Sequence, residues 1–181
     1  MTDLNQNLAT ATLGGGCFWC LEAVYEKMQG VLQVVSGYMG GAWLDPSYAD
    51  VCTGQSGYAE VVNITFDTKL IDFASLLRVF FAIHDPTSLN RQGNDHGTQY
   101  RSVIFYHDAE QHAVALQVMA ETQPQLSQEI VTELVPVIRF YPAEAEHQHY
   151  FAQHPNQGYC AYVVAPKLEK FRKTFKARVR A

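Results

Sequence analysis

A glycine run between an apolar strand and an amphipathic helix is the feature that most constrains how this chain folds. Residues 8–13, Leu-Ala-Thr-Ala-Thr-Leu, have the small and β-branched composition of a short strand. Three glycines and Cys17 follow, and apolar residues then recur at the spacing of one helix face, at Leu21, Val24, Tyr25 and Met28. The sequence therefore predicts a strand, a tight turn and a helix, with Cys17 where the helix begins.

This position favours an ionised Cys17. The first amides of a helix have no partner within the helix, and the helix dipole adds partial positive charge at the same end. Both stabilise a thiolate, which is the nucleophilic form of cysteine. We therefore expect Cys17 to be a reactive thiol that ionises easily.

Cys17 and Cys20 form a Cys-x-x-Cys motif, which redox sites and zinc sites share. A zinc site needs a second ligand pair, and the chain offers only isolated cysteines and two nearby histidines: Cys52, Cys160, His147 and His149. The flanking Phe18 and Trp19 fit an apolar pocket beside a nucleophile better than a metal knuckle. The motif therefore favours redox catalysis. A general dithiol–disulfide oxidoreductase and a zinc-binding module without turnover are the alternatives.

Length and composition indicate a single globular domain over residues 1–181. Hydrophobic residues make up 48% of the chain, which excludes a disordered protein. The net charge of -5 argues against nucleic acid as a partner, and no apolar stretch is long enough to span a bilayer. Residues 1–7 lack the basic region and apolar core of a signal peptide, so the four cysteines point to a reducing compartment. We expect a cytoplasmic monomer that binds neither nucleic acid nor membrane.

Strands and helices alternate along the rest of the chain. Strands are expected at residues 31–38, 60–67, 100–107 and 131–140, the last at a sheet edge because of Pro136. Helices are expected from Asp72, from a capping box of Asp108 with Gln111, and over residues 143–154. Residues 37–57 and 84–99 are predicted long loops, and the chain after residue 154 a looser tail.

This order predicts an α+β fold. We expect a two-layer sandwich, a ferredoxin-like plait with a mixed or antiparallel sheet, helices packed on it and long coil segments. A three-layer doubly wound sheet is the alternative, but the expected strands are too few for it.

Six separated blocks resemble, in the same order, the A-type peptide methionine sulfoxide reductases. They are GCFWCLE at 16–22, YADVCTG at 48–54, GYAEVV at 57–62, RQGNDHGTQYRS at 91–102, FYPAE at 140–144 and GYC at 158–160. Two departures stand out: Tyr58 replaces the usual family histidine, and His96 stands where valine is frequent. Both flank expected acidic residues, so we expect them to tune the pocket without removing its chemistry.

The resemblance implies a site built around Cys17 as nucleophile and Glu60 as the acid aimed at the sulfoxide oxygen. Half-burial beside Val61 and Val62 would raise the pKa of the Glu60 carboxyl towards the value that an acid needs at neutral pH. The other residues carried over are two tyrosines that orient the oxygen, Tyr48 and Tyr100, and three that bind the substrate, Phe18, Trp19 and Asp95.

The resemblance also implies that Cys17 becomes a sulfenic acid, which a second thiol converts to a disulfide. Cys160 matches the usual resolving cysteine of the family. Cys20 is nearer in sequence and could instead close a Cys-x-x-Cys disulfide. We favour Cys160, with Cys20 as an alternative or relay, and expect Cys52 to be an inert packing thiol.

The implied activity is reduction of methionine S-sulfoxide to methionine, in peptides, proteins and the free amino acid. The S epimer comes from the resemblance, because the two sulfoxide epimers need separate enzymes. Thioredoxin would reduce the disulfide. No metal, nucleotide or flavin cofactor is implied, because the chain has no phosphate-cradling motif and no complete ligand set.

Overall fold

A six-stranded mixed sheet forms the centre of the protein. The computed structural model describes residues 7–181, and the sheet has the strand order β7-β6-β1-β3-β2-β8. All neighbouring strands are antiparallel except β6 and β7. The strands are β1 (Leu8–Gly14), β2 (Val31–Met39), β3 (Ala59–Asp67), β6 (Val103–Tyr106), β7 (Glu133–Pro136) and β8 (Tyr141–Pro142). Pro136 lies on an edge strand, as its missing N–H predicts.

The chain runs β1-α1-β2-β3-α3-β6, with α1 at Phe18–Tyr25 and α3 at Phe73–Ile83. When these four strands are numbered 1 to 4 along the chain (β1, β2, β3 and β6), their order across the sheet is 4-1-3-2. This is the connectivity of a ferredoxin-like plait, so the predicted fold class is confirmed.

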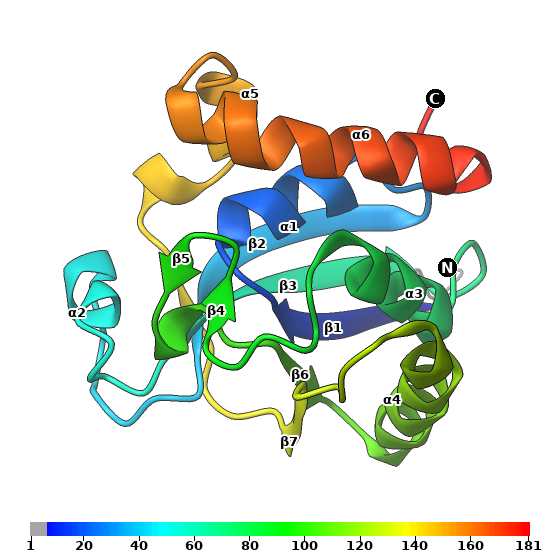
Figure 1. Cartoon of the computed structure of the whole chain (residues 1–181), viewed down its shortest axis with the longest axis horizontal. Coiled ribbons are helices and arrows are strands. Elements are labelled where there is room, and N and C mark those ends of the chain that lie inside the picture. Colours follow the sequence, from blue (N-terminus) through cyan, green and yellow to red (C-terminus); the bar gives the residue numbers. More distant parts are fainter. Residues whose placement is uncertain (1–6) are drawn as a thin grey trace, which may run out of the picture.

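The helices cover one face of the sheet. Alternate residues of β3 belong to different cores: Val62 and Ile64 join the large core with the helices, and Val61 joins a small core on the other face. Two further helices complete the layer, α4 (Ala109–Thr122) and α6 (Ala165–Thr174), and α6 packs against α1 and α3 (Figure 1). Val135, Val137 and Phe140 cover the small core. The architecture is therefore two-layered, and the doubly wound alternative is wrong.

Asp caps begin two of these helices, as the sequence predicts. The Asp72 carboxylate accepts a hydrogen bond from the Ser75 amide at 2.8 Å, and that of Asp108 accepts one from the Gln111 amide at 2.8 Å. The expected capping box at Asp108 is only half formed. The Gln111 side chain accepts from the amide of His107 at 2.9 Å, one residue before the cap.

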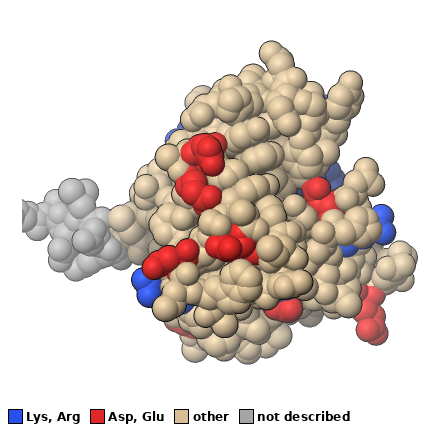
Figure 2. Space-filling view, turned by 90° about the vertical axis from the view of Figure 1, so that its left-hand side faces the viewer, with Lys and Arg blue, Asp and Glu red and all other residues tan. Residues whose placement is uncertain are grey.

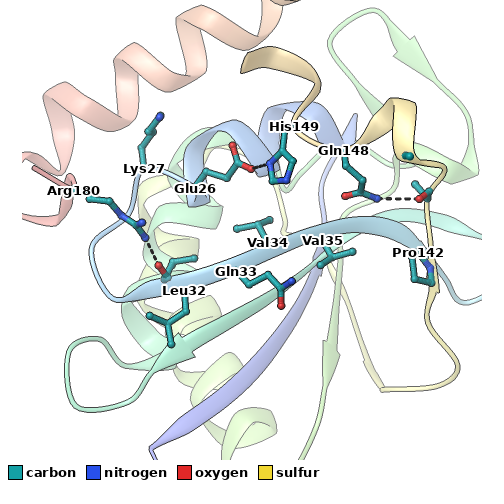
Figure 3. A pocket seen from close by; sticks show the side chains of 13 residues that line it. Glu26, Lys27, Leu32, Gln33, Val34, Val35, Pro142, Gln148, His149 and Arg180 are labelled. Carbon is teal, nitrogen blue, oxygen red and sulfur yellow. Dashed lines mark hydrogen bonds and ion pairs between the residues drawn. The ribbon is translucent and has the colours of Figure 1, made fainter. Parts of the chain in front are cut away.

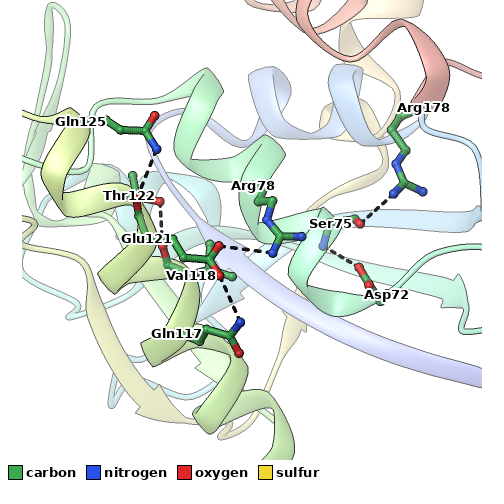
Figure 4. Close-up of polar contacts among 9 residues, drawn as sticks. All are labelled: Asp72, Ser75, Arg78, Gln117, Val118, Glu121, Thr122, Gln125 and Arg178. Atoms are coloured by element: carbon green, nitrogen blue, oxygen red, sulfur yellow. Dashed lines mark hydrogen bonds and ion pairs between the residues drawn. The ribbon is translucent and has the colours of Figure 1, made fainter.

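Polar contacts of α3 hold α4 and the C-terminal segment in place (Figure 4). Arg78 forms an ion pair with Glu121 of α4 at 3.3 Å, and Arg178 donates a hydrogen bond to Ser75 at 3.2 Å. Short 3₁₀ turns at Gln123–Gln125 and Lys176–Arg178 follow α4 and α6.

The helix predicted over residues 143–154 is wrong. The structure has a 3₁₀ turn at Ala145–His147 and the short α5 at Tyr150–Gln153, separated by His149 in the left-handed region at φ 52°. Side chains of distant residues fix this path. The side-chain amide of Gln148 accepts from the Ser36 N–H at 3.0 Å and donates to the Ser36 carbonyl at 2.8 Å, and Glu22 accepts from the His149 backbone N–H at 2.9 Å.

The looser tail predicted after residue 154 is also wrong. A π-helical turn at Cys160–Val164 continues directly into α6. The buried side chains are Cys160, Val164, Leu168 and Phe171, which lie on one helix face. The charged residues between them concealed this stripe in the sequence.

The two predicted long loops contain short elements. The first holds α2 (Tyr48–Cys52), and the second holds the hairpin β4 (Arg91–Gln92) and β5 (Asp95–His96), followed by a 3₁₀ turn at Thr98–Tyr100. Over residues 7–181, none of the helices has both the length and the apolar character that crossing a membrane requires.

We expect the substitution Asp108→Ala to lower the free energy of unfolding by about 1 kcal/mol, because it removes the cap of α4. Chemical denaturation measures this change. Glu110→Gln is the control, since Glu110 is exposed in the same helical turn and its side chain forms no hydrogen bond that the structure records. Equal losses in both variants would show that charge at the helix start stabilises α4, and not the cap.

Candidate active site

Two glycines bring the Cys17 segment against β3. A Cβ at Gly14 would lie 2.9 Å from the Glu60 carbonyl oxygen, so only glycine allows this approach. Gly16 has φ +89°, a left-handed conformation that glycine adopts without strain. Cys17 is then the N-cap residue of α1, with extended backbone at φ -63° and ψ 130°. The predicted strand, turn and helix are confirmed.

The Cys17 thiol does not ionise easily in this structure, contrary to our expectation. Only 8% of the residue is exposed, and burial is the main cause that raises its pKa well above the ordinary value. The nearby charges of Glu60 and Cys20 raise it further. The Trp19 amide at the helix start and the Tyr159 hydroxyl lower it, but burial outweighs them. The resting thiol is therefore protonated.

Glu60 is a fully buried acid beside this thiol. It is 1% exposed, and its Oε1 accepts a hydrogen bond from the Phe18 amide at 3.1 Å. Oε2 is buried and has no hydrogen-bond partner among residues 7–181. Burial, with a contribution from the charge of Asp95, raises the pKa of Glu60 to about 8. The carboxyl group is thus mostly protonated at neutral pH, and burial exceeds the half-burial that the sequence suggests.

Tyr48 and Tyr100 bring two hydroxyl groups towards Glu60. Tyr48 is the first residue of α2, where its amide donates to Glu144 at 3.0 Å. The Tyr100 carbonyl accepts from the Gly16 amide at 3.2 Å, which ties its 3₁₀ turn to the glycine run. Burial and then the charge of Glu60 raise the pKa of both hydroxyls, so both remain hydrogen-bond donors.

Asp95 lies in β5 and is hydrogen-bonded to Tyr159, which lies near the two cysteines. The Tyr159 hydroxyl donates to Asp95 Oδ2 at 2.5 Å, and its proximity lowers the pKa of both Cys17 and Cys20. Sequence reasoning missed Tyr159. The signal was present, because Tyr159 precedes Cys160 in the GYC block.

Phe18 and Trp19 occupy different positions in an aromatic cluster. Phe18 is fully buried in the core, with its ring centroid 6.4 Å from that of Tyr48. Trp19 is half-buried and stacks on Tyr150 at 3.7 Å with an interplanar angle of 5°. His147 lies between them, 4.2 Å from the Tyr48 ring and 5.9 Å from Trp19. The sequence did not predict that His147 and Tyr150 belong to this aromatic cluster, because residues 143–154 were expected to form one helix.

Of the other three cysteines, Cys20 lies nearest to Cys17 along the chain, in the same helical turn. It is 1% exposed, and burial raises its pKa to about 11, while the charge of Lys167 lowers it. Cys160 is fully buried in the large core, in the π-helical turn, and burial raises its pKa also. All four cysteines are free thiols.

The expectation for Cys52 is wrong in one respect. Cys52 is exposed at the end of α2 and is not packed. Burial raises the pKa of its thiol, and Tyr48, which lies near it, lowers that pKa.

The two departures from the family pattern lie outside the Cys17–Glu60 contact. The buried Tyr58 donates its hydroxyl to the Trp43 carbonyl and packs edge-on against Tyr141 at 5.9 Å, so it fastens the preceding loop. His96 is exposed in β5.

Two groups of carboxylate and histidine side chains bring metal-ligating atoms within 4.8 Å of one another, Glu22-Glu26-His149 and Glu144-Glu146-His147. Internal hydrogen bonds already occupy both. Glu22 accepts from the amides of residues 149 and 150, and Glu144 accepts from the Tyr38 hydroxyl and the Tyr48 amide. Glu26 and His149 also line a cavity of about 680 Å³ beside β2, which includes neither Cys17 nor Glu60 (Figure 3).

Comparison with known proteins agrees with this geometry. The family described as peptide methionine sulfoxide reductase matches residues 9–179. The chain is 57% identical over 182 residues to a peptide methionine sulfoxide reductase MsrA of Polynucleobacter asymbioticus, covering 99% of this chain and 96% of that protein. Among solved structures, it is similar to the reduced form of Mxr1 from Saccharomyces cerevisiae, with 34% identity, a TM-score of 0.80 and 86% and 91% of the two chains covered.

A second structure of Mxr1, in complex with Trx2, matches with a TM-score of 0.57 and 25% identity, over 83% of this chain and 89% of that one. The sequence matches and the structural matches identify the same family, and both extend over most of the chain. The protein belongs to the peptide methionine sulfoxide reductase family and is an oxidoreductase of that family.

Proposed function

We propose that this chain, acting as one domain, reduces methionine S-sulfoxide in peptides, proteins and the free amino acid, and so repairs oxidised proteins. The observation that carries the mechanism is the buried Glu60 carboxyl, which is mostly protonated at neutral pH and bonded to the amide that follows Cys17. A sulfoxide sulfur is a poor electrophile until its oxygen receives a proton, and Glu60 is placed to give one.

In the first step, the Glu60 proton moves to the sulfoxide oxygen and Cys17 attacks the sulfur. Glu60 lies close enough to Cys17 for its charge to affect the pKa of the thiol, so the thiol proton has an acceptor nearby as soon as Glu60 becomes a carboxylate. The Cys17 sulfur first bonds to the substrate sulfur. The hydroxyl group then moves from the substrate sulfur to the Cys17 sulfur while the new sulfur–sulfur bond breaks, which leaves a sulfenic acid on Cys17 and releases the sulfide. The substrate sulfur is reduced and Cys17 is oxidised, so electrons balance. A thiol that is protonated at rest is compatible with this step.

The remaining site residues hold the substrate. Tyr48 and Tyr100 donate hydrogen bonds to the sulfoxide oxygen, since both hydroxyls lie near Glu60 and stay protonated. Trp19, Phe18 and the rings packed on them line the apolar side that receives the methyl group. Asp95, fixed by Tyr159, binds the substrate backbone.

In the second step, a thiol displaces water from the Cys17 sulfenic acid and forms a disulfide. We assign this role to Cys160, with Cys20 as a relay that lies nearer to Cys17. Cys160 is fully buried in the core, so the π-helical turn must open before its sulfur reaches Cys17. Thioredoxin then gives two electrons to the disulfide and becomes oxidised, as the Mxr1 complex with Trx2 suggests. The four free thiols fit a cytoplasmic location.

The first prediction concerns the nucleophile. Cys17→Ser should fold normally and lose reduction of the S epimer with any reductant, because a serine hydroxyl does not take up the sulfoxide oxygen. Methionine release in dithiothreitol is the measurement. Cys52→Ser is the matched control and should retain activity. Substantial turnover by Cys17→Ser would disprove both this role and the proposed reaction.

The second prediction concerns the acid. Glu60→Gln should slow single-turnover formation of methionine by about 10²–10⁴-fold, the usual contribution of a positioned acid. The wild-type rate should fall as the pH rises through about 8, because the Glu60 proton is lost there. The rate of Glu60→Gln should lack this fall.

Glu129→Gln, at an exposed carboxylate, is the control for this variant. A wild-type rate that instead rises through pH 8 would mean that ionisation of Cys17, and not protonation of Glu60, limits the step. A Glu60→Gln rate within about threefold of wild type would place the acid elsewhere.

The third prediction concerns the resolving thiol. Cys160→Ser should release one methionine per enzyme and then stall, with impaired turnover by thioredoxin and a sulfenic acid that a dimedone-type reagent traps. Peptide mapping after one round of oxidation should recover a bridge to Cys160 in the wild type. Recovery of only a Cys17–Cys20 bridge, together with full thioredoxin turnover by Cys160→Ser, would assign the role to Cys20.

A further inference from the structure

A cavity of about 650 Å³ opens directly beside the candidate active site. It lies between the β4–β5 hairpin, the end of α3 and the start of α6. Asp95 and Tyr159 line it, and Tyr159 lies near enough to Cys17 and Cys20 to lower the pKa of both thiols. A substrate bound at Cys17 therefore has this cavity next to it. Its volume is in the range of ordinary ligand pockets.

Two lysines bring positive charge to one side of this cavity, whose lining also includes the carboxylates of Asp85 and Asp95. Lys167 and Lys170 both line it from one face of α6, three residues apart. Lys167 is half-buried, and its charge reaches the neighbouring Cys20 and His84. Neither ammonium group has an ion pair or hydrogen bond within the described chain, residues 7–181.

The two carboxylates of the cavity are already hydrogen-bonded. Asp85 accepts from the amide and hydroxyl of Thr87, at 2.9 and 2.6 Å, and from the Ser88 hydroxyl at 3.0 Å. Asp95 accepts from Tyr159. The two lysines, together with the side-chain amide of Asn94, are thus the polar groups of the cavity with no hydrogen bond recorded within residues 7–181. A negatively charged ligand would satisfy them.

We propose that this cavity is a substrate subsite, in which Lys167 and Lys170 bind a carboxylate carried beside the oxidised methionine. The proposal rests on the proposed function and adds a substrate class to it. The carboxylate belongs to an aspartate or glutamate that flanks the sulfoxide in a peptide, or is the α-carboxylate of free methionine sulfoxide. Ile83, Val163 and Pro166 line the same cavity and offer apolar contacts to the adjoining methylene groups.

The overall charge of the protein does not explain such a preference. The net charge is -5, and the face shown in Figure 2 carries scattered carboxylates and few lysines or arginines. Long-range electrostatics would disfavour acidic substrates. A measured preference for acidic substrates would therefore arise from the local pair of lysines, and raising the salt concentration should weaken that preference.

The test compares kcat/KM for matched peptides in which the residue beside methionine S-sulfoxide is Glu or Gln, and for free methionine S-sulfoxide against its amide. We expect the wild type to favour the carboxylate member of at least one pair by about fivefold, the effect of one partly exposed charged hydrogen bond. Lys167→Gln with Lys170→Gln should bring that ratio close to one. Lys173→Gln, one turn further along α6 and outside the cavity, should leave the ratio unchanged.

The results separate this proposal from the proposed function. Turnover of the Gln peptide by the wild type tests the reductase activity alone. A preference in the peptide pair assigns the subsite to acidic side chains, and one in the amino-acid pair assigns it to the α-carboxylate. Ratios near one in both pairs at low salt, or ratios that the double substitution does not change, would overturn the subsite. The salt dependence of the wild-type ratio needs no variant and gives an independent check.

Discussion

The hydrogen bond from the Phe18 amide to Glu60 links the two halves of the candidate site. It joins the first turn of α1 to the middle strand β3, and it occupies one oxygen of a carboxyl that is otherwise buried. Glycine at position 14 is required for the same contact, because any side chain there would meet the Glu60 carbonyl. One backbone donor is too little to keep a carboxylate ionised in such a site, so the proton stays on Glu60.

This contact also explains why the helix start does not ionise Cys17. The dipole and the free amides of α1 favour a thiolate, but one of those amides, that of Phe18, is used by Glu60. Burial and the neighbouring carboxyl then dominate the pKa of Cys17. A helix start is thus insufficient to predict a thiolate when the same turn holds a buried acid. In our mechanism the substrate oxygen is protonated first, and the Cys17 proton leaves only as the bond forms.

The sequence predicts the fold well where local signals and burial agree. Glycines 14–16, the alternation of β3 and the Asp72 cap are local features, and the structure contains all three. The sequence fails where distant side chains decide the path. Residues 143–154 looked helical, but Glu22 and Ser36 bind the backbone and side chains of residues 148–150 and impose a left-handed turn. The roles of Tyr159 and His147 depend on that packing, so spacing along the chain alone does not reveal them.

The position of Cys160 has a consequence for the order of events. A thiol in the core of the reduced protein is protected from solvent oxidants, and it becomes available only when the π-helical turn opens. π-turns are rare and are frequent at functional sites, so this turn is the expected place for such an opening. Cys20 needs no such opening, because it lies in the same helical turn as Cys17, where its amide donates to the Cys17 carbonyl at 3.1 Å. A relay through Cys20 would therefore let the first disulfide form before the C-terminal segment moves.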